Sequence, residues 1–130
     1  MQQLAQFEPY LLAGLVGWTL LFYAVGLWPF DFQAPAHWQI YFWPTPINGV
    51  LNFASFLPFG VLLAALGWGS SPLSSLSPVW TAAIFCGLIS LSVEVAQLFL
   101  PERFSSVADV TLNTLGGMAG AAAFELFSAE

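Results

Sequence analysis

The chain has 130 residues, of which 58% are hydrophobic and only 6% are charged. A soluble domain carries roughly 25% charged residues, so this composition excludes an ordinary soluble domain and indicates an integral membrane protein. The net charge is −6 and Arg103 is the only Lys or Arg, which disfavours nucleic acid and anionic lipid surfaces as partners, because both require several basic side chains.

Four apolar stretches, each long enough to cross a bilayer as a helix of about 20 residues, follow one another along the chain. Between Asp31 and Glu94 there is no Asp, Glu, Lys or Arg. Trp28, a residue type that favours membrane interfaces, closes the first stretch, and proline or Gly/Ser-rich sequence separates the others. We therefore predict an all-α polytopic membrane protein, a compact bundle of four transmembrane helices in one domain over residues 1–130. The predicted spans cover about 9–28, 47–68, 78–100 and 109–127.

Four crossings would place the connections at 29–46 and 101–108 on one side of the membrane, opposite both termini and the 69–77 loop. The polar residues of the last three spans fall toward the 29–46 side. Residues at i, i+4 and i+7 share one helix face, so each of these spans carries a polar stripe at a similar depth. The pattern predicts a shared polar cavity open to one membrane face. The stripes consist of Asn48, Asn52 and Ser55, of Ser90, Glu94 and Gln97, and of Asp109, Asn113 and Gly116.

Two explanations compete for these polar residues. Interhelical polar side chains often only hold helices together, at about 0.6 kcal/mol each, and this explanation suits Asn48, Ser55 and Ser90. A charged group inside a span is costly and is normally retained for function or helix pairing. For Glu94 and Asp109 we favour function, because a neutral amide would hold helices equally well.

Small residues form a pattern in the fourth span at Gly116, Gly117 and Gly120. Small side chains let transmembrane helices approach closely, so we interpret these glycines as helix-packing positions. They would bring the third and fourth spans close enough for Glu94 and Asn113 to interact.

The 29–46 connection is rich in aromatic residues and proline, including Trp38 and Trp43. This composition favours an interfacial belt, with a partly re-entrant segment as the alternative. His37 is the only histidine, and we interpret it as polar surface. Cys86 is the only cysteine, so the sequence predicts no disulfide framework and we interpret this residue as a small packing side chain.

Several enzyme classes lack the residues that they need. A metal hydrolase uses about three or four His, Cys or carboxylate ligands, and the chain has no H-E-x-x-H motif. Nucleophilic catalysis would have to join His37 to a Ser or Cys that lies deeper in the bilayer. Phosphoryl transfer recruits several cations, and Arg103 is alone. The sequence therefore predicts no catalytic residues, no metal site and no cofactor, and it does not favour an enzyme.

Four blocks of sequence resemble, in order and spacing, those of the VanZ-like family, which is named for a teicoplanin-resistance protein. The resemblance extends over roughly residues 10–125. The E-x-x-Q-x-F-x-P-x-R and D-V-x-x-N-x-x-G-G blocks are the most specific. The blocks are Trp28-Pro29-Phe30-Asp31-Phe32, Asn52-Phe53-Ala54-Ser55-Phe56-Leu57-Pro58-Phe59-Gly60, Glu94 to Arg103 and Asp109 to Gly117.

The resemblance implies a small helical protein of the bacterial inner (cytoplasmic) membrane, similar to a member that confers low-level teicoplanin resistance. The chain departs from many relatives in its near lack of basic loop residues. Arg103 alone therefore leaves the orientation open, although the positive-inside tendency would place it in the cytoplasm. The polar signature of the family falls on the face that the topology already marks. These candidate ligand-binding residues are Asp31, Asn52, Glu94, Gln97, Arg103, Asp109 and Asn113.

We expect a recognition site in which Arg103, held by Glu94 or Asp109, presents its planar guanidinium to an anionic or amide-rich headgroup. The expected ligand is a lipid-linked envelope precursor or a lipidated amphiphile such as a lipidated drug. Bilayer lipids, other membrane proteins and a second copy of the chain are further expected partners. One alternative is a structural or accessory subunit of a larger membrane complex, whose polar cluster serves helix packing. A third hypothesis is a transporter with Glu94 as a proton-titrating group.

Overall fold

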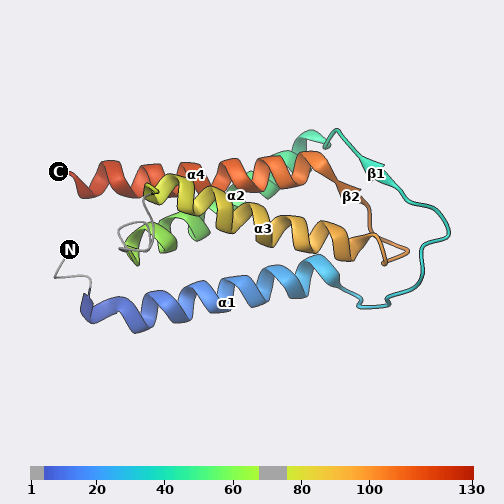
Figure 1. Cartoon of the computed structure of the whole chain (residues 1–130), viewed down its shortest axis with the longest axis horizontal. Helices are drawn as coiled ribbons and strands as arrows, with labels where there is room; N and C mark the ends of the chain where they lie inside the picture. Colours follow the sequence, from blue (N-terminus) through green and yellow to red (C-terminus); the bar gives the residue numbers. More distant parts are fainter. Residues whose placement is uncertain (1–4, 68–75) are drawn as a thin grey trace.

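The computed structural model describes residues 5–67 and 76–130 (Figure 1). Within these ranges the chain forms α1 (Glu8–Leu27), α2 (Pro46–Ala65), α3 (Pro78–Gln97) and α4 (Val107–Ser128), with a short 3-10 helix, η1 (Ala5–Phe7), before α1. The predicted all-α bundle is confirmed. The sequence did not predict two strands of two residues each, β1 (Ile40–Tyr41) and β2 (Ser105–Ser106).

Three of the described helices, α1, α2 and α3, are long and apolar enough to cross a membrane. The chain is therefore a multi-pass membrane protein. The fourth helix, α4, packs within the bundle, and its crossing of the membrane stays a prediction. The third helix ends at Gln97, earlier than the predicted 100, because the chain turns there through hydrogen bonds from Leu98 to Val95 and from Leu100 to Gln97. The predicted end of the second span at Trp68 and most of the 69–77 loop lie outside the described residues.

Hydroxyl side chains begin three of the helices. Thr45 accepts a hydrogen bond from the backbone N–H of Asn48, and Ser77 accepts one from the N–H of Trp80. Each of these two caps is followed by a proline, whose missing N–H costs nothing in a first helical turn. Ser106 caps α4 in the same way by accepting from the N–H of Asp109. Local sequence thus fixes where α2, α3 and α4 begin.

The core contains a cluster of phenylalanine rings between α1 and α2. Phe56 and Phe59 of α2 are completely buried, and the ring of Phe22 from α1 meets Phe56 edge to face with centroids 4.7 Å apart. Leu15 of α1 and Leu63 of α2 complete the contact. Aromatic pairs of this geometry contribute about 0.5 to 1.5 kcal/mol beyond the area they bury. The cluster holds α1 against the bundle at mid-height.

Glycine allows the closest contact in the bundle, between α2 and α4. A Cβ atom at Gly60 would overlap the backbone of Gly117, and a Cβ at Gly116 or Gly120 would overlap carbonyl groups of α2. Gly117 also faces the Cys86 side chain of α3. These positions therefore tolerate no side chain, as expected for backbones in van der Waals contact.

The helices alternate in direction, so that the connections between α1 and α2 and between α3 and α4 lie at one end of the bundle, opposite both termini (Figure 1). We call this the loop end. There β1 pairs in parallel with β2, with Ile40 opposite Ser105 and Tyr41 opposite Ser106. The polar ends of the helices meet at this end, on the side where the sequence pattern had placed them.

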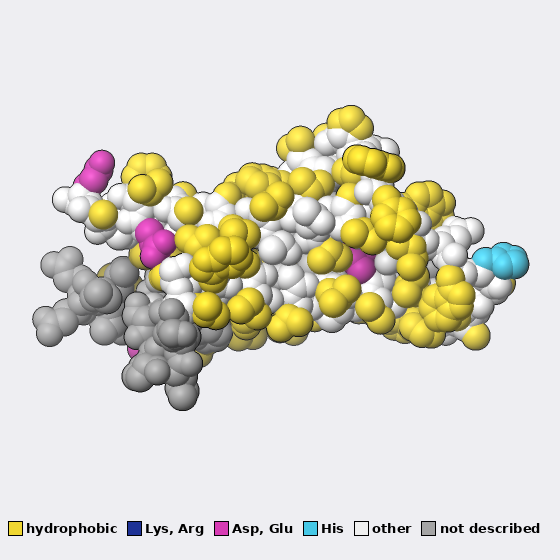
Figure 2. Space-filling view, turned by 45° about the horizontal axis from the view of Figure 1, so that its top comes forward, with side chains coloured by type: hydrophobic (Ala, Val, Ile, Leu, Met, Phe, Trp, Pro, Cys, Tyr) yellow, Lys and Arg dark blue, Asp and Glu magenta, His cyan; other side chains and the backbone are white. Residues whose placement is uncertain are grey.

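Hydrophobic side chains are spread over the face of the bundle that Figure 2 shows, with polar side chains and backbone between them. Among the residues of α1, only Leu15 and Gly26 are buried. Exposed apolar side chains such as Leu20 and Val25 lie along the rest of that helix. An apolar surface of this extent suits contact with lipid tails, as expected for a membrane-spanning helix.

Candidate functional site

Glu94 connects the last turn of α3 to β2. Its side chain is 7% exposed, and Oε2 accepts a hydrogen bond of 2.7 Å from the backbone N–H of Ser106. The Ser105 side chain lies close enough to this carboxylate to stabilise its charge. A negative charge near a helix C-terminus is unfavourable, because the helix dipole is negative there, so these donors offset both the burial and the dipole. Glu94 thus fixes β2, and the start of α4, against α3.

Gln97 and Arg103 both bind the C-terminal end of α1. The Gln97 amide donates to the Gly26 carbonyl at 2.9 Å. Arg103 donates to the same oxygen through Nε at 3.2 Å and Nη2 at 3.0 Å, and through Nη2 to the Val25 carbonyl at 3.0 Å. These carbonyls belong to the last turn of α1, where a cation interacts favourably with the helix dipole. The two side chains therefore cap α1 and hold it against the α3–α4 connection.

This arrangement differs from the expectation that Glu94 or Asp109 would hold Arg103. Backbone carbonyls of α1 take that role instead. The glycine at position 26 lets the end of α1 lie this close to α3, because a side chain at this buried position would collide with Val93 of α3. The described hydrogen bonds of Arg103 use Nε and Nη2, so its Nη1 group remains available as a donor.

Replacing Arg103 with methionine should lower the free energy of unfolding by about 2 kcal/mol, because the Val25 carbonyl loses its charged donor and the Gly26 carbonyl keeps only Gln97. Lysine at this position keeps the charge but loses the planar guanidinium fork. The free energy of unfolding of Arg103→Lys should therefore lie between those of the wild type and Arg103→Met. The thermal midpoint in detergent micelles would measure the series. Equal midpoints for methionine and the wild type would show that capping of α1 contributes nothing.

A second group of polar contacts connects α2, α3 and α4. Asn113 is 1% exposed, and its amide donates to the Ser90 hydroxyl at 2.8 Å. Its Oδ1 atom has no partner within the described residues. Nearer the loop end, the side chains of Asn52 and Ser106 lie beside the Asp109 carboxylate and stabilise its charge. These residues mostly satisfy one another inside the bundle.

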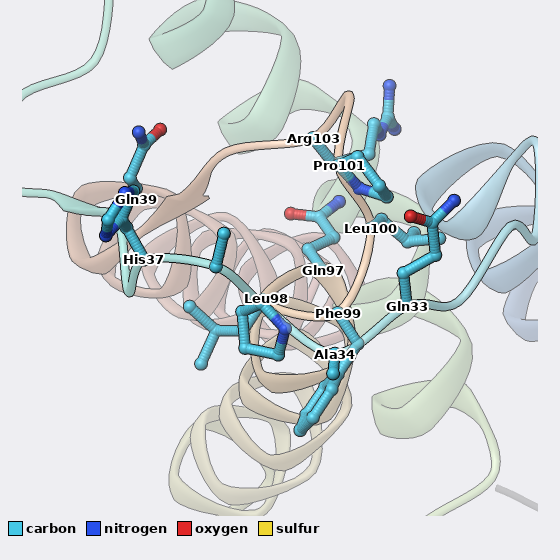
Figure 3. Close-up of a pocket in the computed structure, with 12 residues that line it drawn as sticks. Gln33, Ala34, His37, Gln39, Gln97, Leu98, Phe99, Leu100, Pro101 and Arg103 are labelled. Atoms are coloured by element: carbon cyan, nitrogen blue, oxygen red, sulfur yellow. The ribbon is translucent and has the colours of Figure 1, made fainter.

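A cavity of about 250 Å³ opens between the α1–α2 connection and the end of α3 (Figure 3). We call it the amide cavity, because Gln33, Gln39 and Gln97 are among its lining residues. His37 and Arg103 also line it. Figure 3 shows Gln97 rising from α3 toward the centre, with Gln33 on one side and His37 and Gln39 on the other. A backbone hydrogen bond of 2.8 Å from Gln33 to Phe99 fixes the connection in this position.

A second cavity of about 250 Å³ lies between β1, the start of α2 and the start of α4. We call it the aromatic cavity. The rings of Tyr41, Trp43 and Phe104 line it together with the side chains of Asn48 and Asp109. It shares no lining residue with the amide cavity.

The predicted site residues therefore separate into four groups. Gln97 and Arg103 line the amide cavity, and Asp109 lines the aromatic cavity with Asn52 beside it. Glu94 and Asn113 are buried and line neither cavity. Asp31 is exposed and accepts a hydrogen bond of 2.8 Å from Gln33. The residues expected around one shared cavity thus line two separate cavities or neither.

Sequence reasoning missed Gln33 and Gln39 and interpreted His37 only as surface. All three line the amide cavity. The only signal in the sequence was their position in the connection that faces the polar ends of the helices. No group of three or more His, Cys, Asp or Glu side chains able to hold a metal ion occurs among the described residues.

Comparison with known proteins identifies a family. The sequence model of the VanZ/LLP1 family matches residues 10–128, which is nearly the whole chain. No curated protein and no solved structure matches it.

Proposed function

The chain belongs to the VanZ/LLP1 family of membrane proteins, and we propose that its amide cavity recognises the polar headgroup of an amphiphile. The ligand class is a lipid-linked envelope precursor or a lipidated amphiphile. Its apolar tail would lie along the exposed helix surface, and its headgroup would enter the cavity from the loop end. The protein would act in the bacterial inner membrane.

The chemistry of the cavity lining carries this proposal. Gln33, Gln39 and Gln97 offer both donors and acceptors, which suits peptide bonds and sugar hydroxyls. The free Nη1 group of Arg103 adds a charged donor for a phosphate or carboxylate oxygen. The backbone around these side chains is fixed by the capping of α1 and by the bond from Gln33 to Phe99. A preorganised polar cavity beside a lipid-covered surface fits an amphiphile better than a soluble metabolite.

A glycopeptide drug with a fatty acyl chain, of the teicoplanin type, has the same two-part character. Binding of such a drug, or of the precursor that it targets, would give low-level resistance to it. We propose this as the phenotype to examine.

Native mass spectrometry of the protein released from its own membrane in nanodiscs tests the proposal. The informative variants are Gln39→Leu and His37→Leu, because both residues are exposed loop residues and neither makes one of the hydrogen bonds that hold the fold. A bound small mass should be retained by the wild type and reduced about tenfold by Gln39→Leu, the loss expected when a polar ligand group faces an apolar wall.

Gln6→Leu is the matched control, since Gln6 is exposed at the opposite end of the bundle. It should retain the ligand fully. If Gln39→Leu and His37→Leu both retained the small mass at wild-type occupancy, the amide cavity would not be the binding site.

One observation favours a second function, that of a structural subunit in a larger membrane complex. Glu94, Gln97 and Asn113 each hold another element of the same chain, as a purely structural cluster would. Under this alternative, other protein subunits would be released together with the chain, no small mass would be bound, and Gln39→Leu would change nothing.

A further inference from the structure

The aromatic cavity has the composition of a site for an organic cation. Its walls include the rings of Tyr41 and Phe104, whose planes meet at 75° with centroids 5.3 Å apart. Trp43 is 89% exposed at the same cavity, so its ring is free to cover an occupant. Faces of aromatic rings attract ammonium groups, and perpendicular rings offer such faces on more than one side.

The charge of the cavity agrees with this composition. Asp109 is the only charged residue in its lining, and Arg103 lines the other cavity. The N-terminus of α4 adds a positive dipole equivalent to about half a charge, which a full carboxylate charge exceeds. Glu94 stands behind the cavity, bonded to the backbone of Ser106, which is itself a lining residue. The local field is therefore negative.

The position of the cavity at the loop end limits what can reach it. The loop end terminates three helices that are long and apolar enough to span the bilayer, so lipid headgroups lie at its level. Asn48 and Thr45, which line the cavity at the start of α2, offer an amide and a hydroxyl to the phosphate of such a headgroup. A zwitterionic lipid could place its ammonium group between the rings of Tyr41 and Phe104 and its phosphate near Asn48.

From these observations we propose that the aromatic cavity binds the ammonium headgroup of a membrane phospholipid, with Asp109 as its counter-charge and Tyr41, Trp43 and Phe104 as its walls. This site is distinct from the amide cavity, and the inference does not rest on the proposed function. The bound lipid would occupy the side of the bundle formed by α2 and α4.

The test uses the purified full chain in detergent micelles and measures binding by native mass spectrometry. The probes are dihexanoyl phosphatidylethanolamine, the matching phosphatidylglycerol, which has no ammonium, and free ethanolamine. The ethanolamine lipid should bind, and the glycerol lipid should bind at least about tenfold more weakly. Trp43→Leu and Asp109→Asn should each weaken binding of the ethanolamine lipid by about tenfold.

Trp38→Leu and Glu102→Gln are the matched controls, because both residues are exposed in the connections at the loop end and neither lines the aromatic cavity. Both should bind like the wild type. Trp43 is exposed, so its replacement leaves the fold intact and isolates the effect of the ring. Equal binding of the two lipids, or wild-type binding by Trp43→Leu and Asp109→Asn, would overturn the proposal. If free ethanolamine bound as tightly as the lipid, the ligand of this cavity would be a soluble amine, and the proposal of a lipid would be wrong.

Discussion

Replacing Gly60 with leucine is expected to prevent the bundle from assembling. A Cβ atom at this position would fall on the backbone oxygen of Gly117 and against the backbone N of Ala121. Backbone atoms cannot move aside as a flexible side chain can, so α2 and α4 would have to separate. We expect a loss of at least about 3 kcal/mol in the free energy of unfolding, at the upper end of the usual cost of overpacking.

The measurement is the yield of monodisperse protein in detergent and its thermal midpoint. Gly17→Leu is the matched control, because a Cβ at Gly17 meets no other atom within 4 Å and the residue faces outward from α1. That variant should accumulate normally. If Gly60→Leu accumulated and melted like Gly17→Leu, the close contact of α2 with α4 would be wrong.

Replacing Glu94 with alanine is expected to be the next most damaging change. The backbone N–H of Ser106 would lose its acceptor at a buried position, and β2 would lose its attachment to α3. An unsatisfied buried donor costs about 1 to 3 kcal/mol, and the loss of the Ser105 contact adds to it. The thermal midpoint in micelles should fall accordingly.

Glu94→Gln separates hydrogen bonding from charge. The amide oxygen of glutamine can still accept from Ser106, so this variant should recover most of the stability lost in Glu94→Ala. If both variants were equally unstable, the negative charge of Glu94 would be the stabilising feature, and the account of this residue as an acceptor for β2 would fail.

The helical bundle and its polar end were predictable because both depend on patterns that the sequence carries locally. Apolar stretches of about 20 residues can satisfy their backbone in a bilayer only as helices. Alternating helix directions then bring the ends that carry Gln97 and Asp109 to one side. Four helices and a polar loop end follow from these two facts together, without knowledge of any contact.

The two separate cavities were not predictable, for physical reasons. Strands of two residues have no hydrophobic period, so the pairing of Ile40 with Ser105 leaves no signal in the sequence. The partners of Arg103 are backbone carbonyls, which every residue possesses, so side-chain composition suggested a carboxylate instead. Loop residues such as Gln39 acquire a role only once the connection is folded over the end of α3.

Residue type alone is a poor guide to the cavities of this protein. Glu94 has the costliest charge in the spans, yet it lines neither cavity and holds β2. Exposed residues at the loop end line the cavities instead, His37 and Gln39 in one and Trp43 in the other. Variants at these exposed positions therefore test the proposed binding with little effect on the bundle.

The most direct test of the account is photocrosslinking from position 39 in intact membranes. A photoreactive amino acid placed at Gln39 should capture a small amphiphile, visible as a discrete added mass on the chain, and the same group at Gln6 should not. Capture of the same lipid mixture from both positions, or capture of protein alone from position 39, would contradict recognition of an amphiphile by the amide cavity.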